Sequence, residues 1–271
     1  MATGVLPVFV GRATRAVEFA SESEKEYVAG LRLGGGDQTP RTPPAPVLAE
    51  RPVSVSQAEL EQVLGQFRGE ILQIPPMYSA IKVGGKKLYE LARKGQEVER
   101  QPRAVTIHSL TLEEQTGPAD YTLRVRCSKG TYIRTLCHDI GQALGCGGAM
   151  ESLTRTRVAD FRLEDAHTID EIQTMEQRGE LEKILLPVDR LFLSAPAFSV
   201  TAEGERLLAN GNPIRQTVCC QEKRKRRRRG ISSGRGWRRG CICDGTFAGI
   251  YRVGGRTIQF PRKTVFVINN I

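Results

Sequence analysis

The chain has 271 residues and a formal net charge of +10 at pH 7. No apolar run approaches the length of a membrane-spanning helix, and the first residues lack the regions of a secretory signal, so we expect a soluble, cytoplasmic protein. Seven cysteines in a chain without an export signal favour reduced thiols over a disulfide framework. This length predicts one large domain and a smaller one.

The positive charge is concentrated in one segment. Residues 221–240 contain ten Lys and Arg and a single acid, Glu222, which leaves a net charge of only +1 for the rest of the chain. The basic character therefore does not by itself indicate a basic binding face on a folded domain.

Hydrophobic periodicity predicts the elements of the first two thirds of the chain. Strands are expected over residues 25–33, 77–83, 103–112, 121–128 and 153–161. Helices are expected over residues 13–20, 56–67, 86–94, 131–144 and 169–186, the last with a break near Gly179. Ser56 and Glu59 form the sequence pattern of a capping box, and Gly84-Gly85 predicts a tight turn.

The sequence pattern changes after Pro187, and we place a domain boundary near Leu193. A strand and a short helix are expected over residues 198–209, and further strands over residues 247–253 and 263–268. These short elements predict a small β module at the end of the chain.

The segment from Cys127 to Met150 has the clearest functional pattern. It predicts a strand, a turn and a helix that Thr131 caps, with Tyr132 and Arg134 in the first turn. Residues two apart do not share a helix face, so these two side chains project differently. A flat ring and a fixed cation suit stacking on a base and pairing with a carboxylate or phosphate. Taken alone, however, the segment is more often an ordinary strand-turn-helix with a surface arginine.

Several segments resemble the bacterial TruB family of tRNA pseudouridine synthases, which act on the T-loop uridine. They are ATGVLPVFVGRATR, EKEYVAGLRLG, FRGEILQIPPMYSAIKVGGKKLYELARKG, CSKGTYIRTLCHDIGQALGCG and LTRTRV. NGNPIR and GTFAGIYRV resemble that family's RNA-binding module of the PUA type. The resemblance spans nearly the whole chain.

The resemblance implies an α+β fold. Residues 1–193 would form the catalytic domain, with a mixed sheet that lacks its N-terminal strands, and residues 194–271 a PUA-like module that an Arg-rich segment interrupts at about 217–244. The implied reaction converts uridine 55 of tRNA to pseudouridine without a metal or organic cofactor. The implied partner is the T-arm of tRNA, bound by a monomer that does not associate with membranes.

The resemblance also implies roles for individual residues. Tyr27 would stack on the flipped uracil, and Arg134 would orient the catalytic carboxylate. Tyr132 and Leu153 would line the pocket. Without the resemblance, Tyr27 is an ordinary half-buried strand residue and Leu153 a core leucine.

Two further basic residues match family positions near the site. Lys82 and Arg155 are candidates for phosphate contacts or for structural contacts. By default Lys82, beside a Gly-Gly turn, would be a solvated charge at the end of a hairpin.

The family's nucleophilic aspartate has no counterpart in this sequence. In the family motif Gly-x-Leu-Asp-Pro-x-Ala-Thr-Gly, residues 1–4 match the last four positions, so the aspartate would lie two residues ahead of Met1. The chemistry requires a carboxylate nucleophile at this point. We therefore expect an N-terminally truncated synthase without turnover.

The Arg-rich segment allows two interpretations. It could bind RNA phosphates with an affinity that falls steeply with salt, or it could be a solvated charge run. Cys219-Cys220 and Cys241-x-Cys243 lack the spacing typical of structural zinc sites, so no metal is expected.

Three functions remain open on the sequence. The leading one is a tRNA pseudouridine synthase. The alternatives are a non-catalytic protein that binds or folds tRNA, and a basic nucleic-acid-associated protein that depends on the arginine run.

Overall fold

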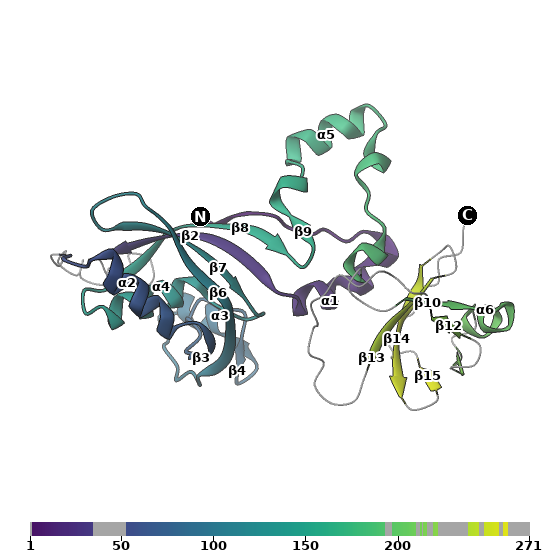
Figure 1. Ribbon diagram of the computed structural model, residues 1–271, viewed down its shortest axis with the longest axis horizontal. Helices are drawn as coiled ribbons and strands as arrows, with labels where there is room; N and C mark the ends of the chain where they lie inside the picture. Colours follow the sequence, from purple (N-terminus) through teal and green to yellow (C-terminus); the bar gives the residue numbers. More distant parts are fainter. Residues whose placement is uncertain are drawn as a thin grey trace. The chain divides into compact units, whose positions relative to one another are not determined.

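The computed structural model describes residues 2–34, 53–192, 197–209, 212, 214–215, 219–221, 238–243, 247–254 and 257–259 (Figure 1). The chain divides into two compact units. The first consists of Met1–Pro7 and Ser21–Ala166, and the second of Val8–Ala20 and His167–Ile271. This division falls earlier than the predicted boundary near Leu193, which stays a prediction, as does the PUA-like character of residues 194–271.

The first unit is built on a seven-stranded mixed sheet in the order β1-β8-β2-β7-β6-β3, with β9 paired to β8 (Figure 1). Only β1 and β8 pair in parallel; the other neighbours in this sheet are antiparallel. The strands are β1 (Ala2–Gly4), β2 (Lys25–Leu33), β3 (Gly69–Gln73), β6 (Arg103–Gln115), β7 (Asp120–Cys127), β8 (Gly148–Val158) and β9 (Phe161–Arg162).

One face of this sheet forms the core. β7 buries every second side chain from Tyr121 to Cys127, because successive side chains of a strand point to opposite faces. The helices α2 (Gln57–Gln66) and α4 (Ile133–Ala143) pack against this face, and their buried leucines belong to the same hydrophobic cluster. The predicted capping box at the start of α2 is confirmed.

Gly141 allows α4 to approach the sheet closely. A Cβ atom added at this position would lie 2.0 Å from the backbone nitrogen of Gly148, at the start of β8. Any side chain here would have to displace backbone, so the glycine fixes how near α4 lies to the strand that follows it.

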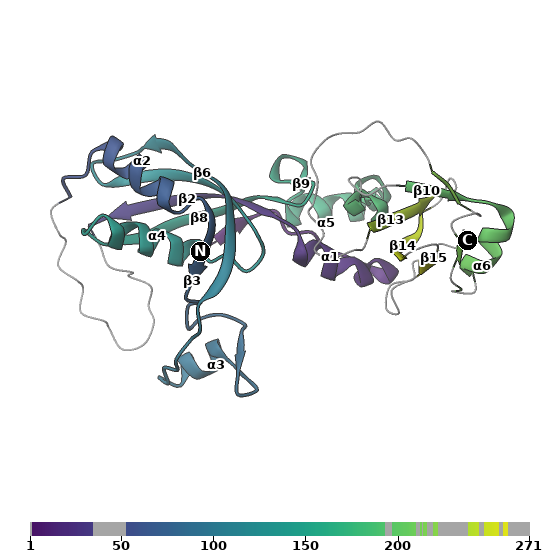
Figure 2. The same cartoon turned by 60° about the horizontal axis from the view of Figure 1, so that its bottom comes forward.

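The segment between β3 and β6 differs from the prediction. The strand expected over residues 77–83 is wrong, since only β4 (Lys82–Val83) is extended and paired, in a hairpin with β5 (Lys86–Lys87). The helix α3 (Leu88–Arg93) follows the hairpin and lies away from the sheet (Figure 2). β3 itself was not predicted, because a five-residue strand with one buried side chain leaves a weak pattern.

In the second unit, a six-stranded sheet has the order β11-β15-β14-β13-β10-β12. Its strands are β10 (Ala197–Val200), β11 (Ile214–Arg215), β12 (Cys219–Gln221), β13 (Arg238–Cys243), β14 (Phe247–Gly254) and β15 (Thr257–Gln259). The predicted strand over residues 263–268 and most of the Arg-rich segment lie outside the described residues.

The helices outside the first sheet are short. A 3-10 helix, Gly11–Ala16, runs into α1 (Val17–Glu22) where a single helix over residues 13–20 was expected. The helix predicted over residues 169–186 has its expected break near Gly179, between α5 (Ile169–Gln177) and a 3-10 helix (Leu181–Ile184), and α6 (Ala202–Ala209) follows β10. None of the described helices is long and apolar enough to cross a membrane.

Candidate active site

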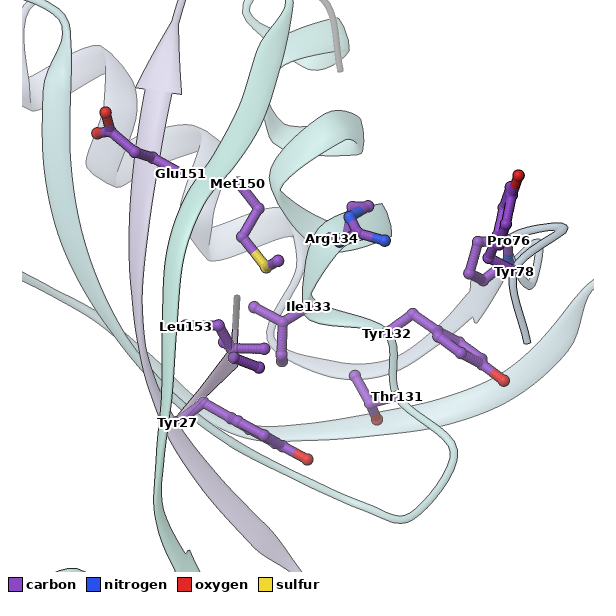
Figure 3. Close-up of a pocket in the computed structure, with 11 residues that line it drawn as sticks. Tyr27, Pro76, Tyr78, Thr131, Tyr132, Ile133, Arg134, Met150, Glu151 and Leu153 are labelled. Atoms are coloured by element: carbon purple, nitrogen blue, oxygen red, sulfur yellow. The ribbon is translucent and has the colours of Figure 1, made fainter. Parts of the chain in front are cut away.

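The first unit contains a cavity of about 320 Å³ beside the start of α4 (Figure 3). This volume lies in the range of roughly 300–1,000 Å³ that is typical of small-ligand sites. The residues that line it are Ala2, Tyr27, Pro76, Tyr78, Thr131, Tyr132, Ile133, Arg134, Met150, Glu151 and Leu153.

Four residues that the sequence singled out meet in this cavity. Tyr27 lies on β2 and Leu153 on the neighbouring strand β8. Leu153 pairs with Ala29, two residues after Tyr27. Tyr132 and Arg134 come from the start of α4 (Figure 3). The site is thus formed where the N-terminus of a helix approaches two adjacent strands. The lining residues Pro76, Tyr78 and Met150 were missed, because apolar and aromatic side chains carry no chemical signature in a sequence.

Thr131 does not cap α4 as predicted. Its hydroxyl donates a hydrogen bond to the carbonyl of Ser128 at 2.9 Å, which closes the turn instead. The N-cap position belongs to Tyr132, whose backbone is extended and whose side chain makes no capping bond. The backbone N–H of Tyr132 donates instead to Oε1 of Gln73 at 3.0 Å.

The Tyr27 hydroxyl remains protonated at neutral pH. Burial is the main cause that raises the pKa of this phenol, and the neighbouring Cys127 raises it further. The charge of Arg155 and its hydrogen bond to Tyr27 oppose these effects without cancelling them. The ring therefore enters the cavity as a neutral aromatic surface with a hydroxyl that can donate a proton.

Arg155 makes structural contacts. Its Nε donates to the carbonyl of Val5 at 2.8 Å, and its own carbonyl accepts from the Val5 N–H at 2.9 Å. Gly4 makes this approach possible, because its φ is +116° and an added Cβ would lie 2.2 Å from the Arg155 carbonyl oxygen. Arg155, which is the register partner of Tyr27 between β8 and β2, thus holds the residue that follows β1 beside these strands. Lys82, in contrast, is exposed on β4 and is not among the lining residues.

Arg134 presents a cation to the cavity. Its Nε is buried and has no hydrogen-bond partner within the described part of the chain. A guanidinium that lines a cavity can pair with a carboxylate or phosphate oxygen that enters it.

Glu151 is the one acidic residue that the structure places along the cavity. Its carboxylate points away from Tyr27 and Arg134 (Figure 3) and lies 2.7 Å from the guanidinium of Arg32. Within the described residues, no group of three or more His, Cys, Asp or Glu side chains could hold a metal ion.

Residues 1–133 match the family model described as "TruB family pseudouridylate synthase (N terminal domain)", and residues 134–193 match "tRNA pseudouridylate synthase B C-terminal domain". The chain is also similar to curated proteins named tRNA pseudouridine synthase B. The protein of Syntrophomonas wolfei is 44% identical over 221 residues, which cover 80% of this chain and 73% of the relative. The protein of Lachnoclostridium phytofermentans is 47% identical over 220 residues, which cover 79% and 71%.

Solved structures support the fold class alone, because their identity is low. A Cbf5-Nop10-Gar1 complex matches with a TM-score of 0.69 and 23% identity over 97% of this chain and 73% of that chain. An H/ACA RNP bound to a substrate RNA matches with a TM-score of 0.68 and 22% identity, over 96% and 72%. The predicted α+β fold with a mixed sheet is confirmed. The two family models and the relatives at 44% and 47% identity show that the chain belongs to the TruB family of tRNA pseudouridine synthases, which are isomerases of uridine in tRNA.

Proposed function

We propose that the substrate of this protein is the T-loop uridine of tRNA, position 55, flipped into the cavity beside α4. The observation that carries the proposal is the convergence of Tyr27, Tyr132 and Arg134 on one cavity. Two aromatic rings and one cation suit an unstacked base that is attached to an anionic backbone. We also propose that the protein acts on this uridine as a monomer.

The reaction needs no second substrate. The bond between N1 of uracil and C1′ of the ribose breaks, the base turns, and a bond forms between C5 and C1′. The proton on C5 leaves and N1 gains one, so uridine and pseudouridine contain the same atoms. We assign Tyr27 to stacking on the base and to movement of the C5 proton, and Arg134 to pairing with the nucleophilic carboxylate.

Residues 1–271 are proposed to bind the T-arm without turnover. The reason is the lack of a suitable carboxylate among the described residues that line the cavity, since Glu151 is paired with Arg32 and turned away. This observation favours a second function, binding or folding of tRNA without modification, for the chain as it stands.

Single-turnover conversion of a T-arm RNA hairpin tests the proposal. The 271-residue chain is compared with the same chain preceded by a Gly-x-Leu-Asp-Pro segment, called the Asp-extended chain below, and with its Asp→Asn variant. Pseudouridine formed only by the Asp-extended chain, and only on the hairpin with its T-loop uridine intact, supports the proposal. Turnover by the 271-residue chain means that another carboxylate serves.

We further propose that residues 194–271 contact tRNA as a module of the PUA type, which the motifs NGNPIR and GTFAGIYRV support. Deletion of residues 223–229 separates this module from the arginine run. If affinity for tRNA and its salt dependence barely change, the run is not the basis of binding.

A further inference from the structure

Gln73 ends β3, and its side-chain amide is buried against the residue that begins α4. Only 1% of Gln73 is exposed. Its Oε1 accepts from the backbone N–H of Tyr132 at 3.0 Å, and its Nε2 donates to the carbonyl of the same residue at 3.3 Å. We propose that Gln73 is a positioning residue that holds Tyr132 and Arg134 in place for the flipped uridine. This inference rests on the proposed function of the cavity.

The two hydrogen bonds from Gln73 take the place of a side-chain cap, which Tyr132 does not provide for α4. Tyr132 is the N-cap residue of α4, with extended backbone angles of φ −104° and ψ 105° and no side-chain cap. Its carbonyl already accepts the first helical bond, from Leu136 at 3.0 Å. The amide of Gln73 adds a second donor to that carbonyl and an acceptor for the Tyr132 N–H, as a neighbouring strand would.

The position of Gln73 connects two walls of the cavity. The chain runs directly from Gln73 to Pro76 and Tyr78, which line one side. The hydrogen bonds reach across to Tyr132, which lines another, and Arg134 follows one half-turn later in α4. A change at Gln73 should therefore move the two walls relative to each other, although Gln73 itself does not line the cavity.

An amide is the side chain that this geometry requires. One buried group must accept from an N–H and donate to a carbonyl at the same time, which a neutral amide does. Methionine has a similar length and shape but neither function. An ionised glutamate can accept from the N–H but cannot donate to the carbonyl, whereas a protonated glutamate can do both.

The test compares Gln73→Met and Gln73→Glu with the matched changes Gln142→Met and Gln142→Glu, at an exposed glutamine of α4. The probe is a T-arm hairpin that carries a fluorescent uridine analogue at the T-loop position. Anisotropy of an end label reports binding of the hairpin, and emission of the analogue reports stacking of the base. We expect Gln73→Met to bind the hairpin nearly as the unchanged chain does. Its equilibrium for base stacking should fall roughly tenfold, the usual effect of losing one or two hydrogen bonds.

The Gln73→Glu variant provides a pH-dependent rescue. Burial raises the pKa of a carboxyl group, so acidification from pH 8 to pH 5 converts this side chain to the form that can donate. The stacking signal of Gln73→Glu should recover as the pH falls, while Gln73→Met stays low and the Gln142 variants follow the unchanged chain. A side chain that only fills space would show no such recovery.

Hydrogen exchange in the free protein tests the role of Gln73 independently of the proposed substrate, because no RNA is present. Exchange of the Tyr132 amide should be slow in the unchanged chain and in Gln142→Met, and fast in a folded Gln73→Met. If Tyr132 exchange is the same in Gln73→Met, or if this variant stacks the base normally, the inference is wrong. If the unchanged chain binds the hairpin without stacking the analogue, the proposed substrate is wrong, and the exchange measurement still decides the role of Gln73.

Discussion

Nη2 of Arg32 lies 2.7 Å from Oε1 of Glu151, and the Glu151 carboxylate points away from Arg134 (Figure 3). The Arg32 and Glu151 side chains are 53% and 48% exposed, so the pair should add little to stability. The ion pair matters because Arg32 orients the Glu151 carboxylate, which is the one carboxylate along the described part of the cavity. Glu151 is therefore a poor candidate for the nucleophile.

The first prediction contrasts Glu151 with Arg134. In the Asp-extended chain, Glu151→Gln should convert the hairpin at nearly the unchanged rate, whereas Arg134→Gln should lose at least about 100-fold, because a preorganised charged donor is removed. Single-turnover rates at saturating enzyme measure both. A large fall in the conversion rate of Glu151→Gln would show that the Glu151 carboxylate takes part in the reaction.

The second prediction separates the ring of Tyr27 from its hydroxyl. Tyr27→Phe should keep the stacking signal of the fluorescent hairpin, and Tyr27→Leu should lose most of it, because base-aromatic stacking contributes about 1–3 kcal/mol. Conversion by the Asp-extended chain should fall in Tyr27→Phe, since the protonated phenol is removed. Equal stacking in the Leu and Phe variants would exclude Tyr27 as the stacking surface.

The third prediction compares two helical glycines. Gly65 in α2 has open space around an added Cβ, whereas at Gly141 that atom would lie 2.0 Å from the backbone of Gly148. Gly65→Ala should raise the free energy of unfolding by up to about 1 kcal/mol, and Gly141→Ala should lower it by about 1–3 kcal/mol. Urea denaturation measures both. A stabilising Gly141→Ala would mean that α4 can shift without cost.

The fourth prediction concerns the pH dependence of stability through Glu26. Burial by itself would raise the pKa of Glu26, but hydrogen bonds from Thr156 and Arg124 and the nearby charges of Arg157 and Arg124 hold it below its ordinary value of 4.5. A carboxylate with a lowered pKa stabilises the fold above its unfolded-state pKa, and this contribution is lost as the pH falls through the folded-state pKa.

Glu26→Gln should therefore be less stable than the unchanged chain at pH 7, and the difference should shrink as the pH falls below about 4.5. Urea denaturation at several pH values follows the two proteins. Glu114→Gln, at an exposed position of β6, is the control and should show no such convergence. A difference that is independent of pH would indicate lost packing instead.

The fifth prediction is that Cys127 does not react in the folded protein. Burial is the largest cause that raises the pKa of its thiol to about 11, while Thr131 and Lys25 act in the opposite direction. At pH 8 the thiolate is a minor form in a buried position. Iodoacetamide should label Cys127 only after denaturation, as peptide mass spectrometry can measure. Rapid labelling under native conditions would show that this part of β7 opens.

Some elements could be predicted because their signals are local. The strand over residues 25–33 was predicted with its observed bounds from alternating side chains, and the capping box at Ser56 from two residues three apart. The strand over residues 77–83 was wrong, because a short apolar alternation does not report whether a partner strand is present. The prediction that Thr131 caps α4 was also wrong. The Thr131 hydroxyl donates to the carbonyl of Ser128, and the N-cap residue is Tyr132.

The sequence by itself determined the family of this protein, its fold class and the residue types of its site, because long motifs such as SKGTYIRT contain that information in adjacent positions. Only the tertiary structure decided that Tyr27 and Leu153 lie on neighbouring strands beside Arg134, that Arg32 engages Glu151, and that Gln73 holds Tyr132. These relationships join residues far apart in the chain. They depend on strand register and on where buried polar groups find partners, and neither is fixed by local periodicity.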